Sequence, residues 1–396
     1  MLETIRQFAE EQLVTSGAGD TARTAHARHF AAREADVMAL WDSPRQREAY
    51  EWFALELANL RSAFRWAADR GDLDTAAAIA VCATFIGHWV EQYEPCAWAE
   101  ELIEPARAVD HRRLAQLYML AAMCYMTGRI DAFLSYTEAG QITMDSDRFD
   151  AVPILFIGAL GGGFLTTVGA EECVRWTRAM IARSPEHRSI LEPNLVFALA
   201  FAGANDEALA VSDELFARTD TLVNPTLISA VLLAYGYTHR NTEPAAAYEA
   251  FRRGLGIAQA NGDRQMESVL AMNLASLSAL HAEPADALEF SALAIRTYYD
   301  SGSLSFVSGA LGILAALLDR LGDYEPAAVI SAFADTPIAR ATYPEIVTAI
   351  AHLHEVLGDE SYEAFARRGA NMSNAAKAAY ALDQIDRART ALRSDA

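Results

Sequence analysis

Five breaks between apolar segments of the sequence look alike, and they constrain the fold more than any other feature. Each break is a short polar turn that starts a new helix and carries a small alanine at a fixed place. These alanines are Ala76, Ala208, Ala247, Ala287 and Ala327. The last four are spaced 39, 40 and 40 residues apart, and the gap before Ala208 leaves room for units near residues 127–134 and 168–176. The spacing predicts a tandem repeat.

A period of this length is typical of a two-helix unit in which a small residue sits where the paired helices cross. The rest of the chain reads as helix after helix, with breaks at Gly, Asn, Asp and Pro and no convincing alternating strand pattern. We therefore predict an all-α fold, an α-solenoid of tetratricopeptide-like helical hairpins. The turn GDYEPA at 322–327 comes closest to the tetratricopeptide pattern, and the other units are longer and degenerate.

The two helices of each predicted unit differ in charge. The first helices, at 222–238, 269–280 and 304–318, are nearly free of charged residues, whereas the second helices carry the charge. In solenoids of this kind the first helix lines the concave side. We therefore expect a tightly wound array whose inner surface is partly buried or rather apolar.

One uncharged stretch, residues 151–170, is as long as a membrane span. It also contains Pro153 and five glycines, which dilute its hydrophobicity. We interpret it as a core helix with its turn, in which the glycines allow close packing, and we predict no membrane span.

Two asparagines occupy the same place in their repeats. Asn194 lies 14 residues before Ala208, and Asn273 lies 14 residues before Ala287. In the tetratricopeptide pattern this offset lies on the inner face of the first helix, where an amide offers a donor and an acceptor to an extended peptide. The alternative is an asparagine that bridges neighbouring helices or binds water. With Tyr235 on the same layer, these residues form the predicted partner-binding or ligand-binding face.

Composition and motif searches exclude several functions. The formal charge of −21 argues against a nucleic-acid surface and against a polybasic membrane patch. The sequence has no P-loop, HExxH or GxSxG motif. The four cysteines have no metal-ligand spacing, and we interpret them as buried thiols in a reducing cytosol. We predict a cytoplasmic, non-enzymatic protein without metal or cofactor.

The first half of the chain contains all six tryptophans, including Trp52, Trp66, Trp89 and Trp98. We expect core aromatic residues here, with an exposed docking surface as the alternative.

Three stretches together resemble a family. MLETIRQFAEEQL with HARHFAAREAD at 26–36 resembles the junction after the winged-helix part of large bacterial signal-transduction ATPases of the STAND type. ELANLRSAFRWAADRGD at 56–72 resembles the start of their helical-repeat region. The stretch at 357–382 resembles its end, with Ser373 placed to cap the last helix. These ATPases include the MalT-like and LuxR-type regulators of actinobacteria, some fused to a cyclase domain.

The resemblance implies that residues 1–42 are a helical junction, the tail of a winged-helix domain, and that residues 43–396 are the solenoid, with a closing helix at 373–392. It implies a sensor and protein-interaction module that binds an inducer or a partner protein and contacts the ATPase and winged-helix domains of a parent regulator. The alternative is a small-molecule receptor that encloses an apolar ligand within the solenoid.

The first segment carries an apolar stripe at Leu2, Ile5, Phe8, Ala9 and Leu13, as an amphipathic helix does. If that stripe is exposed, we expect the chain to self-associate through its first helix.

Overall fold

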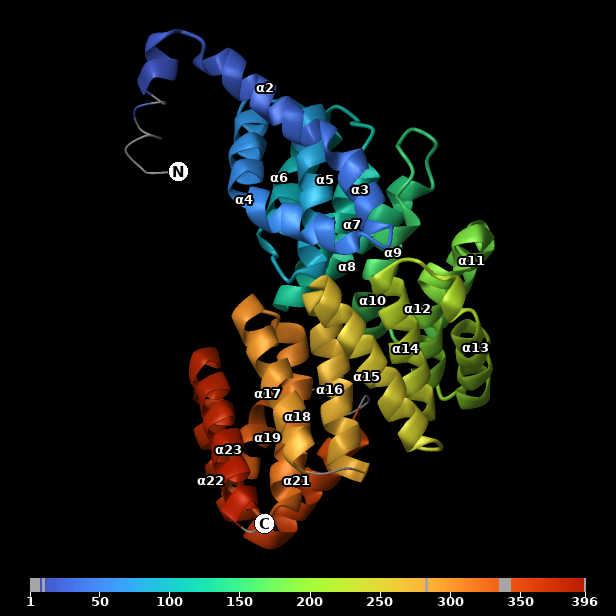
Figure 1. Cartoon of the computed structure of the whole chain (residues 1–396), viewed down its shortest axis with the longest axis vertical. Helices are drawn as coiled ribbons and strands as arrows, with labels where there is room; N and C mark the ends of the chain where they lie inside the picture. The colour runs from blue at the N-terminus through green and yellow to red at the C-terminus, as the bar shows by residue number, and fades with distance from the viewer. Residues whose placement is uncertain (1–7, 9–10, 282–283, 335–342, 395–396) are drawn as a thin grey trace. The chain divides into compact units, whose positions relative to one another are not determined.

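The structure, a computed structural model, describes residue 8 and residues 11–281, 284–334 and 343–394. These residues form α-helices and short 3₁₀ helices joined by turns, and no strand occurs among them. Their tandem hairpins establish the predicted all-α solenoid fold (Figure 1). No helix in these ranges is long and apolar enough to cross a membrane.

The chain divides into two units, which are described separately. Unit 1 comprises residues 1–88, 92–123 and 134–156, and unit 2 comprises residues 89–91, 124–133 and 157–396. Between residues 19 and 159 the α-helices are α2 (Gly19–Ala32), α3 (Glu34–Trp41), α4 (Gln46–Ala68), α5 (Leu73–Trp89), α6 (Glu94–Ala108), α7 (Leu114–Ala121), α8 (Ile130–Met144) and α9 (Ile154–Ala159).

In unit 1 the segment predicted as a junction packs on the helix that follows it. Helices α2 and α3 both lie against α4. Trp41 is buried and its indole N–H donates to the hydroxyl of Tyr50 (3.0 Å). Trp98 is also buried, whereas Trp52 and Trp66 are half-buried. The boundary at residue 42 stays a prediction, and residues 1–7 and 9–10 of the predicted junction lie outside the described part of the chain.

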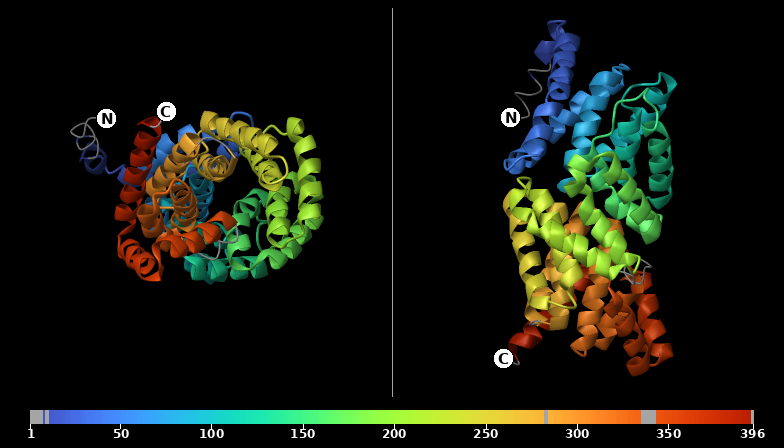
Figure 2. Two further views of the ribbon diagram at one scale, coloured as in Figure 1. Left: turned by 90° about the horizontal axis from the view of Figure 1, so that it is seen from below. Right: turned by 90° about the vertical axis from the view of Figure 1, so that its right-hand side faces the viewer.

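Unit 2 contains the most regular hairpins. Its helices are α10 (Gly161–Thr167), α11 (Ala170–Arg183), α12 (Arg188–Phe201), α13 (Asn205–Ala217), α14 (Pro225–His239), α15 (Pro244–Asn261), α16 (Arg264–His281), α17 (Pro284–Ser301), α18 (Leu304–Arg320), α19 (Tyr324–Ala334), α21 (Pro344–Leu357), α22 (Asp359–Ala370) and α23 (Asn374–Ser394). Successive hairpins follow a curved path, which the left view of Figure 2 shows.

The repeat alanines lie where the sequence predicts close helix crossings. Ala208, Ala247, Ala287 and Ala327, near the starts of α13, α15, α17 and α19, are at most 1% exposed, and Ala76 in unit 1 is fully buried. A larger side chain at these points would push the paired helices apart. The five alanines are buried, as we expect of small residues where paired helices cross.

The first helices of unit 2 form one layer. α12, α14, α16 and α18 each pack against the next first helix, whereas the pairs α13–α15, α15–α17 and α17–α19 pack far less extensively. Because the inner layer of a curved array has the closer neighbours, the first helices line the inside of the curve in unit 2.

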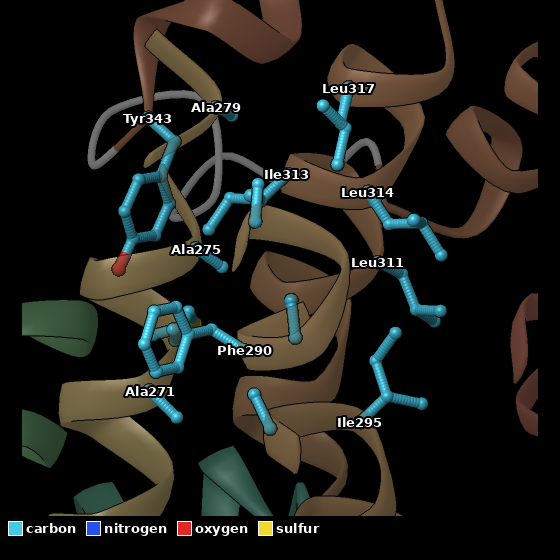
Figure 3. Packing of buried hydrophobic residues seen from close by; sticks show 14 of the residues in the cluster. Ala271, Ala275, Ala279, Phe290, Ile295, Leu311, Ile313, Leu314, Leu317 and Tyr343 are labelled. Carbon is cyan, nitrogen blue, oxygen red and sulfur yellow. The ribbon is translucent and has the colours of Figure 1, made fainter. Parts of the chain in front are cut away.

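The core of unit 2 lies between these layers. Ala271, Ala275 and Ala279 repeat at every turn of α16 and lie alongside Phe290 of α17 and Ile313 of α18 (Figure 3). The small residues on α16 allow the larger side chains of its neighbours to interdigitate, so the unit buries a continuous apolar strip.

The glycine-rich stretch at 151–170 forms two short helices, α9 and α10, rather than one core helix. Its glycines do permit close packing, as predicted. A Cβ atom on Gly158 would lie 2.8 Å from Ile190, and one on Gly163 would lie 2.6 Å from Phe133.

The chain closes with α23, which packs against α17, α18 and α19. Its predicted cap is present, because the backbone N–H of Ala376 donates to Ser373 Oγ (3.3 Å).

Candidate functional site

A groove with a volume of about 460 Å³ lies within unit 2, among the first helices. It is bounded by the C-terminal ends of α14, α16 and α18 and by the first two turns of α21. Four separate hairpins therefore contribute to it. Binding sites in solenoids are often built in this way, because the inner layer presents one helix from every repeat.

One face of α16 runs along the groove. Asn273, Ser276, Leu277 and Leu280 line it, at spacings that put side chains on the same side of a helix. Ala316 of α18 adds a further small apolar surface. The groove thus combines an aliphatic strip with polar groups, as sites for peptides and small ligands do.

Two carboxylates face the groove, and both already accept hydrogen bonds. Glu345 Oε1 accepts from the hydroxyl of Ser276. Asp319, only 7% exposed, lies 2.9 and 3.0 Å from Nδ1 of His352, which donates to it. These contacts tie α21 to α16 and to α18, so the walls of the groove are cross-linked by polar contacts.

Arg240 enters the groove from the end of α14. Its guanidinium lies 3.8 Å from the ring centroid of Tyr237 and stacks on that ring. Burial raises the pKa of Tyr237 and, more strongly, that of Tyr343, so both phenols stay protonated near neutral pH. Tyr343 comes directly before α21 and is 3% exposed (Figure 3).

Of the three residues predicted from sequence, Asn273 lies in the groove. Its side-chain N–H donates to the carbonyl of Val269 one turn earlier (2.9 Å), and its side chain lines the groove although the residue is 5% exposed. The amide is thus held in one orientation, and its carbonyl oxygen and second N–H make no other hydrogen bond to the residues that the structure describes.

Asn194 has a different environment. Its amide N–H donates to the carbonyl of Gly158 (2.9 Å), and its side chain fills the space next to Gly161, where a Cβ atom would lie 2.2 Å away. This residue bridges neighbouring helices, which is the alternative that the sequence left open.

Tyr235 does not line the groove either. Its ring stacks between Phe216 of α13 and His239 of its own helix, with centroid distances of 4.0 Å on both sides. The structure therefore brings only Asn273 together with the other groove residues.

Sequence reasoning missed the charged members of the groove, Arg240, Asp319, Arg320 and Glu345. A signal was present, because Asp319 and Arg320 end a first helix that is otherwise free of charge after residue 304. Charges at the end of an apolar inner helix indicate a point where the inner layer meets solvent.

In the described part of the chain, no group of three or more His, Cys, Asp or Glu side chains could hold a metal ion. All four cysteines are buried.

Fold and groove together define an all-α solenoid with a groove on its inner layer, whose lining is mainly apolar with a few polar groups. No protein-family model matches the sequence, and no curated protein matches it. One solved structure that resembles the chain is a "Circular tandem repeat protein with novel repeat topology and enhanced subunit contact surfaces". It is 13% identical, with 95% of this chain and 100% of that chain covered, and the TM-score is 0.18, too low for the likeness to carry an argument.

Proposed function

We propose that this chain is a non-enzymatic, cytoplasmic sensor and protein-interaction module of a signal-transduction ATPase transcriptional regulator. Its groove would receive a segment of a partner protein. The observation that carries the proposal is Asn273, an oriented amide in a groove built from four hairpins. Such an amide can pair with the N–H and C=O groups of an extended peptide, and the aliphatic strip beside it can hold one of the peptide's side chains.

The binding part of the proposal can be tested by selecting peptides from a displayed library on the immobilised full chain. Thr348→Trp places a large ring in the groove from an exposed position on α21. Thr390→Trp makes the same change at an exposed site on α23, outside the groove, and is the matched control. Both threonine hydroxyls donate to the carbonyl four residues earlier, so the two substitutions disturb their helices alike.

We expect the selected peptides to lose at least tenfold in affinity on Thr348→Trp and on Asn273→Ala, and to keep it on Thr390→Trp. A library that yields no groove-dependent peptide contradicts the proposed binding function.

The regulatory part of the proposal is tested on the gene. An in-frame P-loop ATPase upstream of the codon for Met1 would support a parent regulator that contains this module. A stop codon followed by a ribosome-binding site at that place would contradict it.

A further inference from the structure

Some hydrogen-bonding side chains of the groove already have partners within the protein, and others have none among the described residues. Each of its two carboxylates already accepts a hydrogen bond, Glu345 from Ser276 and Asp319 from His352. A cationic ligand would have to share these carboxylates with partners that are already in place.

Arg320, by contrast, lines the groove, is exposed and makes no ion pair among the residues that the structure describes. Many arginines of this unit have a carboxylate partner, as Arg178 has Glu207 and Arg368 has Glu325. Asp319, its neighbour in sequence, is turned to His352 instead. A cation at the end of α18 is favoured by the helix dipole, but that interaction leaves its planar N–H groups available.

Further donors lie beside Arg320. Asn273 has a second side-chain N–H, because its hydrogen bond to Val269 uses one. Asn241, exposed at the end of α14, lines the groove as well. Arg320, Asn273 and Asn241 thus give the groove several donors beside an aliphatic strip formed by Leu277, Leu280 and Ala316.

We propose that the groove recognises an acidic segment of a partner protein, an extended peptide in which an Asp or Glu carboxylate pairs with Arg320 and a nearby aliphatic side chain lies on Leu277 and Leu280. This inference rests on the proposed function and specifies the partner. A guanidinium and a carboxylate form two parallel N–H···O bonds, so Arg320 would fix the position of the acidic residue along the groove.

The test reads the composition of the peptides selected on the full chain. We expect Asp or Glu to be enriched over Asn and Gln at a fixed distance from an aliphatic residue. Arg320→Gln should weaken the selected peptides about tenfold, a change of roughly 1.4 kcal/mol. Arg296→Gln, which removes an exposed arginine of α17 outside the groove, should leave them unchanged. Selection on Arg320→Glu should enrich Lys or Arg at the same position.

Two results overturn the inference and differ in what they say of the proposed function. The first result is a set of peptides that need Asn273 but show no preference for acidic residues, or that bind Arg320→Gln as well as the natural chain. It would contradict the acidic specificity and would still support a peptide-binding groove. A selection without any groove-dependent peptide would remove both.

Discussion

Buried carboxylates are the residues at which this fold departs furthest from an apolar array. Glu91 is 1% exposed and its backbone has a left-handed φ of 57°. Ser268 Oγ donates to its Oε1 at 3.3 Å, and Asp263 just before α16, Arg264 of α16 and Ser301 of α17 lie near it. Burial raises the pKa of Glu91 to about 8, so the carboxyl group is protonated in the folded state at neutral pH.

This pKa predicts a dependence of stability on pH. Between a pKa of 4.5 for the unfolded chain and about 8 for the folded chain, only the folded state holds the proton, so stability falls as the pH rises through this range and then levels off. Glu91→Gln should remove this loss, on the order of a few kcal/mol at pH 8.

Urea denaturation at several pH values from 5 to 9 measures the effect of Glu91→Gln, with Glu355→Gln on the exposed side of α21 as the control. Identical pH profiles for Glu91→Gln and the natural chain would contradict the prediction.

Glu192 is a second buried acid, and here the charge is paired. Its side chain is 4% exposed and lies between Arg188 (2.6 Å) and Arg218 (2.7 Å). Because both arginines keep part of their surface in water, we expect Glu192→Ala to cost about 1–3 kcal/mol, less than breaking a fully buried pair. Glu207→Ala breaks an exposed pair with Arg178 and should cost under about 1 kcal/mol. Equal losses in urea denaturation would show that burial of Glu192 does not matter.

At the scale of the element, close approach between helices decides which substitutions the fold accepts. A Cβ atom on Gly369 in α22 would lie 2.0 Å from the backbone oxygen of Val329 in α19, which cannot swing aside. We expect Gly369→Ala to cost about 3 kcal/mol and to loosen α22.

Gly256→Ala is the matched control for Gly369→Ala. Gly256 lies inside α15 with nothing within 4 Å of an added Cβ, so alanine there should stabilise the chain by about 0.5–1 kcal/mol. Urea denaturation measures the stability of both variants, and hydrogen exchange of α22 shows whether Gly369→Ala loosens that helix. A Gly369→Ala variant as stable as the natural chain would contradict the close approach.

The helices and their caps could be predicted from the sequence, whereas most contacts in the groove could not. The alanine spacing predicted the hairpins from α12 to α19, and the capping pattern predicted Ser373, because both depend on contacts close in sequence. The groove could be predicted only in part. Asn194 and Asn273 lie at equal distances in sequence from their repeat alanines, so the sequence predicted the same position for both. Because Gly161 has no Cβ, however, the side chain of Asn194 fits against α9 and α10 and donates to the carbonyl of Gly158. Neither this contact nor the convergence of Arg240 and Glu345 on one groove is encoded in a local pattern.

At the scale of the whole molecule, the exposed apolar residues near the first segment predict an effect on mass in solution. Phe8 is 63% exposed and Val14 is 61% exposed. Chains that leave such side chains in water tend to associate through them. We expect the chain to self-associate, and deletion of residues 1–16, or Phe8→Ser combined with Val14→Ser, to give a lower mass by light scattering. An unchanged mass would contradict association through this segment.

The packing of each hairpin against the next has a consequence for how the chain is made. From α12 to α19, a hairpin finds its main partner in the segment synthesised just before it, so a nascent chain can bury each new pair of helices as it leaves the ribosome. Helix α23 is different, because its contacts with α17 reach back to a helix about ninety residues earlier. Helix α23 can therefore dock only after α17, α18 and α19 have formed the surface that it packs against.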